Sequence, residues 1–93
     1  MIRAHIYISG RVQGVGFRAN TRRKANQLDV KGWVRNLRDG RVEVLAEGKA
    51  EDIKKLIDWC YHGPTMANVK DLQVEKTEAT GEFRGFTAKR GTY

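Results

Sequence analysis

The stretch Gly10-Arg11-Val12-Gln13-Gly14-Val15-Gly16-Phe17-Arg18 joins two different hydrophobic patterns. Before it, apolar residues alternate with polar ones along residues 2–8, which predicts a strand over residues 2–9 with one buried face. After it, a helix over residues 17–28 is predicted by four residues at helical spacing: Phe17, Thr21, Ala25 and Leu28. The glycine-rich stretch is therefore a connection from a strand into a helix.

The chemistry of this connection favours an anion. Its glycines let the backbone turn tightly and approach a ligand without a Cβ in the way. The helix that follows begins with free N–H groups and a positive dipole end, and Arg18 adds a planar charged fork that suits phosphate oxygens. The glycines alone are equally consistent with a plain tight turn. The stretch is not a Walker A loop or a dinucleotide fingerprint, because the Gly-Lys-Ser/Thr sequence and the glycine spacing are missing.

Outward from this stretch, the remaining patterns complete one domain, residues 1–93. Strands are predicted at 33–38 and 41–47, joined by a hairpin at Asp39-Gly40, and a second helix at 50–62 ends at Gly63-Pro64. Strands at 69–78 and 83–89 follow. The order βαββαβ plus a short final strand predicts a ferredoxin-like α/β sandwich, in which two helices cover one face of an antiparallel sheet.

The net charge of +7 is concentrated in one half of the chain. Residues 1–41 carry ten Lys and Arg against two acidic residues, whereas residues 42–93 carry eight against nine. The half that contains the glycine-rich stretch thus attracts anions, although charge alone does not separate a small phosphate ester from a polyanion.

Other functional classes find little support in the composition. The lone cysteine, Cys60, falls on the apolar stripe of the second helix, so we expect a buried thiol and no disulfide. His5 and His62 lack companion ligands, and we expect no metal and no cofactor. No apolar run is long enough to span a membrane and no signal peptide is present, so we expect a cytoplasmic protein that does not bind membranes, and a monomer.

A second candidate residue, Asn36, lies in the segment Gly32-Trp33-Val34-Arg35-Asn36. Asparagine is common beside turns, so Asn36 has a purely structural interpretation at the end of its strand. In the functional interpretation its amide, which both donates and accepts, holds a water next to the anion site. We expect the side chain at an exposed strand end.

With both segments in view, the chain resembles the acylphosphatase family. The run from Gly10 to Arg18 is similar to the first family signature without a mismatch, and the run from Gly32 to Asn36 is similar to the second. The resemblance extends over nearly the whole chain through further matching positions: Gly40, Val42, Gly48, Gly63-Pro64, Ala67, Val69 and Gly85-Phe86.

This resemblance implies a function and assigns roles. It implies hydrolysis of the carboxyl–phosphate bond of an acyl phosphate, with Arg18 binding phosphate and Asn36 orienting the attacking water. The backbone N–H cradle would come from six residues: Gln13, Gly14, Val15, Gly16, Phe17 and Arg18. The chain departs from the family pattern at Asp29, where a glycine is expected, at Ala88, where a larger aliphatic residue is usual, and in the tail 90–93.

The chain offers few candidate catalytic groups, and an acyl phosphate needs few for its hydrolysis. The carboxylate leaving group has a conjugate-acid pKa of about 4, so no general acid is required, and phosphoryl transfer depends mainly on positioning and charge. Two alternatives stay open: a non-catalytic module of a larger protein, and a basic RNA-binding domain. We expect no nucleic acid partner, because the strand 41–47 has no aromatic residue for base stacking and carries Glu43 and Glu47.

Overall fold

Seven helices and strands follow one another in the order expected from the sequence. The computed structural model describes all 93 residues. In chain order the elements are β1 (Ile2–Arg11), α1 (Phe17–Gln27), β2 (Lys31–Asn36), β3 (Val42–Gly48), α2 (Ala50–His62), β4 (Asn68–Glu78) and β5 (Phe86–Thr92). The second helix has the predicted bounds, and β5 begins three residues later than predicted.

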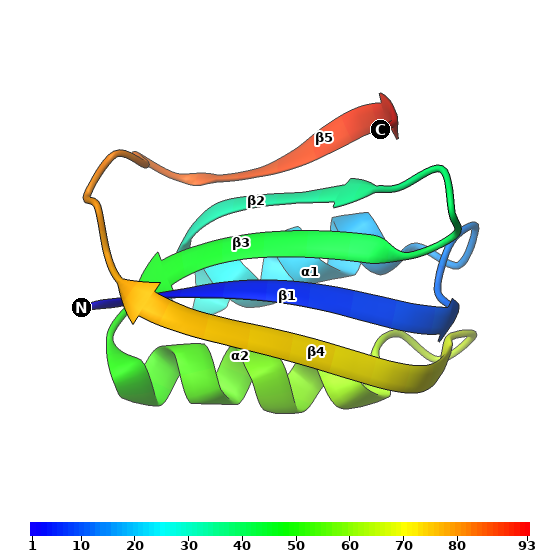
Figure 1. Ribbon diagram of the computed structural model, residues 1–93, viewed down its shortest axis with the longest axis horizontal. Coiled ribbons are helices and arrows are strands. Elements are labelled where there is room, and N and C mark those ends of the chain that lie inside the picture. The colour runs from blue at the N-terminus through cyan, green and yellow to red at the C-terminus, as the bar shows by residue number, and fades with distance from the viewer.

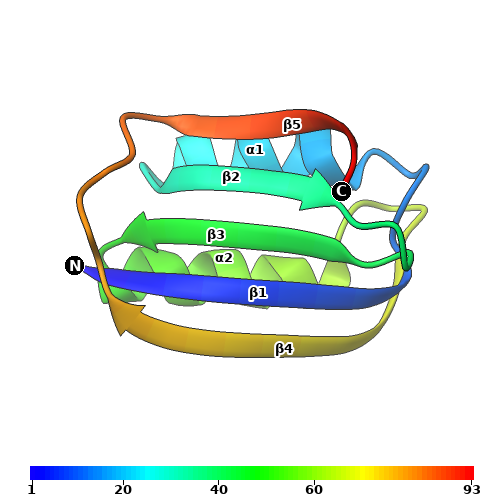
Figure 2. The ribbon, with the colours of Figure 1, turned by 45° about the horizontal axis from the view of Figure 1, so that its top comes forward.

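The strands form one five-stranded sheet in the order β4-β1-β3-β2-β5, and both helices lie against the same face of it (Figures 1 and 2). This arrangement confirms the ferredoxin-like α/β sandwich. The alternation of apolar and polar residues in β1 gives the sheet one apolar face for the helices to cover. Ala4, Ile6 and Ile8 are fully buried on this face, while the residues between them face the other side. None of the helices is long and apolar enough to cross a membrane.

The expectation of an antiparallel sheet is wrong at one edge. The strands β1, β3, β2 and β4 pair antiparallel, but β5 pairs parallel to β2, so the sheet is mixed. The reason is the path of residues 79–85, which cross the end of the sheet from β4 to the opposite edge (Figure 2). Seven extended residues reach about 23 Å, which covers the four strand spacings of about 4.8 Å between these edges. Because β5 starts at the end where β4 finishes, it must run in the direction of β2.

Buried carboxylates anchor the face of the sheet that no helix covers. Glu47, with a side chain 5% exposed, accepts hydrogen bonds from Arg3 and from the backbone N–H groups of Thr80 and Gly81 in the crossing segment. Burial raises the pKa of Glu47, but these hydrogen bonds outweigh it and lower the pKa to about 2. Glu43 pairs in the same way with His5 at 2.6 Å and Arg35 at 2.7 Å.

The thiol of Cys60 is part of the core, as predicted. It is free and fully buried in α2, and burial raises its pKa to about 12. A thiol with this pKa stays protonated near neutral pH and is a poor nucleophile.

Candidate active site

The glycine-rich loop between β1 and α1 presents its backbone to solvent. Gly14 and Gly16 have φ values of +74° and +80°, which side-chain-bearing residues rarely adopt. Gly16 is the N-cap residue of α1, and no side chain caps this helix end. The N–H groups from Gln13 to Gly16 donate no hydrogen bond within the protein. The loop therefore offers a run of free N–H donors at a positive helix end, which is the geometry of an anion-binding nest.

The Gln13 side chain fixes the position of this loop. Its amide Nε2 donates to the carbonyl oxygens of Leu37 at 2.7 Å and Arg41 at 2.9 Å. These two carbonyls belong to the turn between β2 and β3, where the Leu37 N–H also donates to the Arg41 oxygen at 2.8 Å. Gln13 thus ties the loop to the hairpin whose first strand ends at Asn36. No pattern of residue types around Gln13 indicated these hydrogen bonds.

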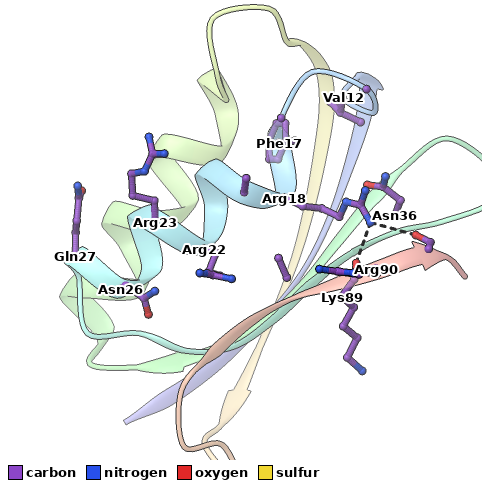
Figure 3. Close-up of a pocket in the computed structure, with 15 residues that line it drawn as sticks. Val12, Phe17, Arg18, Arg22, Arg23, Asn26, Gln27, Asn36, Lys89 and Arg90 are labelled. Atoms are coloured by element: carbon purple, nitrogen blue, oxygen red, sulfur yellow. Dashed lines mark hydrogen bonds between the residues drawn. The ribbon is translucent and has the colours of Figure 1, made fainter.

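Arg18, on the first turn of α1, is held by the C-terminal strand. Its Nη1 donates to the carbonyl oxygens of Lys89 at 2.9 Å and Gly91 at 3.2 Å (Figure 3). A guanidinium has five N–H donors, and those on Nε and Nη2 of Arg18 have no partner in the protein. The side chain is therefore fixed at one edge and free to bind a ligand at the other. This arrangement explains why an arginine sits at the helix end that the dipole makes unfavourable for a cation.

Asn36 is the last residue of β2 and is buried, with 9% of its surface exposed. The expected position at a strand end is therefore confirmed, but the expected exposure is wrong. Gly32, Val34 and Asn36 alternate toward the helices, so the asparagine occupies a position where an apolar residue would normally pack. Its backbone carbonyl accepts from the N–H of Tyr93 at 2.9 Å, whereas its side-chain amide makes no hydrogen bond in the protein. Because no fully buried side-chain polar atom is left unpaired, the amide atoms of Asn36 reach the groove. An amide placed this way is available to a water or a ligand.

These parts meet in one groove of about 900 Å³ between α1 and β5. In Figure 3 the side chain of Arg18 extends from α1 toward Asn36. The groove brings together five predicted site residues: Gly14, Gly16, Phe17, Arg18 and Asn36. Gln13 and Val15 do not line it. The Phe17 ring is 2% exposed and stacks edge-on against Trp59 at 5.5 Å, so only its backbone can serve the site.

Sequence reasoning missed several residues of this groove. Arg22, Arg23 and Asn26 lie off the apolar stripe by which α1 was predicted, and they are exposed, but they also line the groove. Arg90 lines the opposite wall. None of the lining residues is Asp, Glu, His or Cys, and nowhere in the chain do three such residues gather as a metal site would need.

The fold and this groove place the chain among the small ferredoxin-like α/β sandwiches, and comparison with known proteins narrows the class. The acylphosphatase family profile matches residues 4–88. The chain is 53% identical over 87 residues to an acylphosphatase of Roseiflexus sp. (strain RS-1), which covers 94% of both chains. The crystal structure of an acylphosphatase from Bacillus subtilis matches with a TM-score of 0.93 at 33% identity, over 97% of this chain and 100% of that chain. The chain belongs to the acylphosphatase family, and it is a hydrolase that acts on acyl phosphates.

The same fold also occurs inside a larger protein. The crystal structure of HypF from T. kodakarensis matches all of this chain with a TM-score of 0.82 at 33% identity, but this chain covers only 12% of it. The relative from Roseiflexus, by contrast, has a similar length to this chain.

Proposed function

We propose that Arg18 and the loop N–H groups bind the phosphoryl group, and that Asn36 positions the water that attacks it. The observation that carries this proposal is the half-anchored guanidinium of Arg18, which β5 holds through Nη1 while Nε and Nη2 remain free. The free N–H groups of the loop and the unpartnered amide of Asn36 share its groove. A phosphoryl group bound there would have donors on its oxygens and a polar amide beside it.

The reaction needs little more than this arrangement. The water oxygen bonds to phosphorus while the bond from phosphorus to the acyl oxygen breaks, and the carboxylate leaves with the electron pair. Because its conjugate acid has a pKa of about 4, this leaving group needs no proton. Charge on the phosphoryl oxygens is stabilised by Arg18 and by preorganised backbone dipoles, and these do not reorganise during the reaction.

The proton of the attacking water goes to a phosphoryl oxygen of the substrate. The groove supports this assignment because it is lined by no carboxylate and no imidazole that could accept the proton. The products are the carboxylate and inorganic phosphate. The proposed role of Asn36 is therefore orientation of the water and not proton abstraction.

We also propose that the protein acts as a monomer in the cytoplasm and binds no nucleic acid. The free buried thiol of Cys60 needs no oxidising compartment. On the uncovered sheet face, the aromatic rings are already stacked by the chain's own cations: Arg35 lies 4.6 Å from the Trp33 ring and Arg41 lies 4.6 Å from the Tyr7 ring. Rings covered in this way offer no free platform for bases.

Release of phosphate from acetyl phosphate tests the proposal. We expect turnover that a chelator leaves unchanged, and competitive inhibition by inorganic phosphate, because the same donors bind both. Loss of activity on chelation, restored by a divalent metal, would contradict the proposed mechanism. Inhibition that phosphate exerts without competing with acetyl phosphate would contradict the shared site.

A further inference from the structure

The groove is much larger than the phosphoryl group it is proposed to hold. It extends from the loop along α1, past Arg22 and Asn26, with β5 as its other wall. Its lining includes five cationic residues and no acidic one: Arg18, Arg22, Arg23, Lys89 and Arg90. Two of these are engaged elsewhere. Arg18 serves the phosphoryl site, and the Lys89 ammonium lies over the Trp33 ring at 4.7 Å on the other face of the sheet.

Arg22 and Arg90 remain inside the groove without a partner. Arg22 lies one helical turn after Arg18, on the same face of α1. Arg90 lies two residues after Ala88, where β5 shifts its register against β2, and its side chain lines the groove. In Figure 3 the Arg22 side chain lies on the α1 side of the groove and the Arg90 side chain on the β5 side, while Arg23 points away. Neither Arg22 nor Arg90 takes part in an ion pair, although both are exposed.

Two unpaired cations on the two walls of one open groove attract an anion. The anion bound there would lie next to the phosphoryl site, because four residues of helix correspond to about 6 Å. That is the reach of an acyl group of about four carbons, given C–C bonds of about 1.5 Å. Ala88 also lines the groove, and its small side chain leaves room for such a chain.

We propose that this groove binds the acyl half of the substrate and selects acyl groups that carry a second negative charge, with Arg22 and Arg90 as the residues that recognise it. The proposal rests on the proposed role of Arg18 as the phosphoryl-binding residue. It adds the substrate class: an acyl phosphate whose acyl chain ends in a carboxylate or another anionic group. Arg22 and Arg90 are then specificity residues, and the chemistry stays at Arg18 and Asn36.

Two non-hydrolysable probes isolate the second charge. Phosphonobutyrate carries a phosphonate at one end and a carboxylate at the other, and pentylphosphonate has a similar chain without the carboxylate. Their dissociation constants are measured by calorimetry, which requires no turnover. We expect phosphonobutyrate to bind the unmodified protein about ten- to 25-fold more tightly, since each of the two exposed ionic contacts contributes about three- to fivefold.

Substitutions then assign the preference to residues. Arg22→Gln and Arg90→Gln should each lower the preference for phosphonobutyrate by about three- to fivefold, and the double variant should abolish it. The matched control is Arg84→Gln, which removes the same charge at an exposed position outside the groove and should leave the preference intact. Added salt should weaken the preference, because both arginines are exposed.

The outcomes separate the two proposals. Equal affinity for both probes in the unmodified protein, or an equal loss in Arg84→Gln, would overturn the acyl subsite while hydrolysis of acetyl phosphate still supports the proposed function. Failure of inorganic phosphate and both probes to compete with acetyl phosphate would instead contradict the phosphoryl site. A preference that disappears only in the Arg22 and Arg90 variants would support the subsite.

Discussion

Asn36→Ala distinguishes water positioning from phosphate binding. The side-chain amide has no partner in the protein, so its removal leaves no buried donor or acceptor unpaired. The backbone bonds of Asn36, to β3 and to Tyr93, do not involve the side chain and should persist. We therefore expect the free energy of unfolding to change by no more than about 1 kcal/mol, although the residue is buried.

The kinetic effect should be large and confined to turnover. Loss of one preorganised polar group costs roughly 10²–10³ in kcat. The inhibition constant of phosphate should change little, because Arg18 and the loop N–H groups remain. Asn36→Asp should weaken phosphate binding as well. A carboxylate at about 5 Å from a phosphate charge, at an effective dielectric constant of about 20, repels it by about 3 kcal/mol, or roughly a hundredfold.

The assay measures kcat, the phosphate inhibition constant and the unfolding midpoint on the same preparations. The matched control is Asn68→Ala, which removes an exposed asparagine at the start of β4, outside the groove, and should keep all three values. Wild-type kcat in folded Asn36→Ala would refute the proposed role and leave Asn36 as a structural residue. A loss that appears only in the phosphate inhibition constant would make it a binding residue.

Two further predictions rest on side-chain contacts and a third on a backbone conformation. Arg18→Lys keeps the positive charge but loses the guanidinium, which can bond the two β5 carbonyls and a ligand at the same time. We expect turnover to fall by about 10³-fold or more, and near-normal turnover would contradict the assignment. Glu47 has its pKa lowered from 4.5 to about 2, so it stabilises the fold above pH 4.5 and this contribution, up to about 3 kcal/mol, should disappear as the pH falls toward 2. Denaturant unfolding of Glu47→Gln should show a weaker decline over that range, and an unchanged decline would count against the pairing. Asp29 has φ +57°, so Asp29→Gly should raise the free energy of unfolding by about 0.5–1 kcal/mol, and a lower melting temperature would contradict this.

Local patterns were sufficient to predict most of the elements. The helical stripe of α2 and the stop at Gly63-Pro64 are carried by adjacent residues, and the bounds agree with the structure. The departure at Asp29, where the family pattern has a glycine, also has its structural counterpart, since this residue takes the left-handed conformation. The direction of β5 could not be predicted in the same way, because it depends on which edge the crossing segment reaches.

The sequence named several residues that line the candidate site, but it did not show how they are assembled. The carbonyls of Lys89 and Gly91 that hold Arg18 are more than 70 positions away in sequence, and backbone acceptors leave no mark on residue type. The two hydrogen bonds from Gln13 to the hairpin also end on backbone carbonyls, so residue types do not reveal them either. The burial of Asn36 did have a local signal, the alternation of Gly32, Val34 and Asn36, which the common occurrence of asparagine beside turns obscured.

Ion pairs across the sheet explain where the uneven charge of the sequence lies in the structure. Two acidic residues of the second half, Glu43 and Glu47, lie under the uncovered face, where they neutralise Arg35 and Arg3 of the first half. The arginines of α1 have no such counterpart, since no acidic residue lines their groove. The positive field that the composition assigns to one half of the chain is therefore concentrated on one face of the molecule, between α1 and β5. A field focused in this way steers anionic substrates to the groove, because the other face presents paired charges.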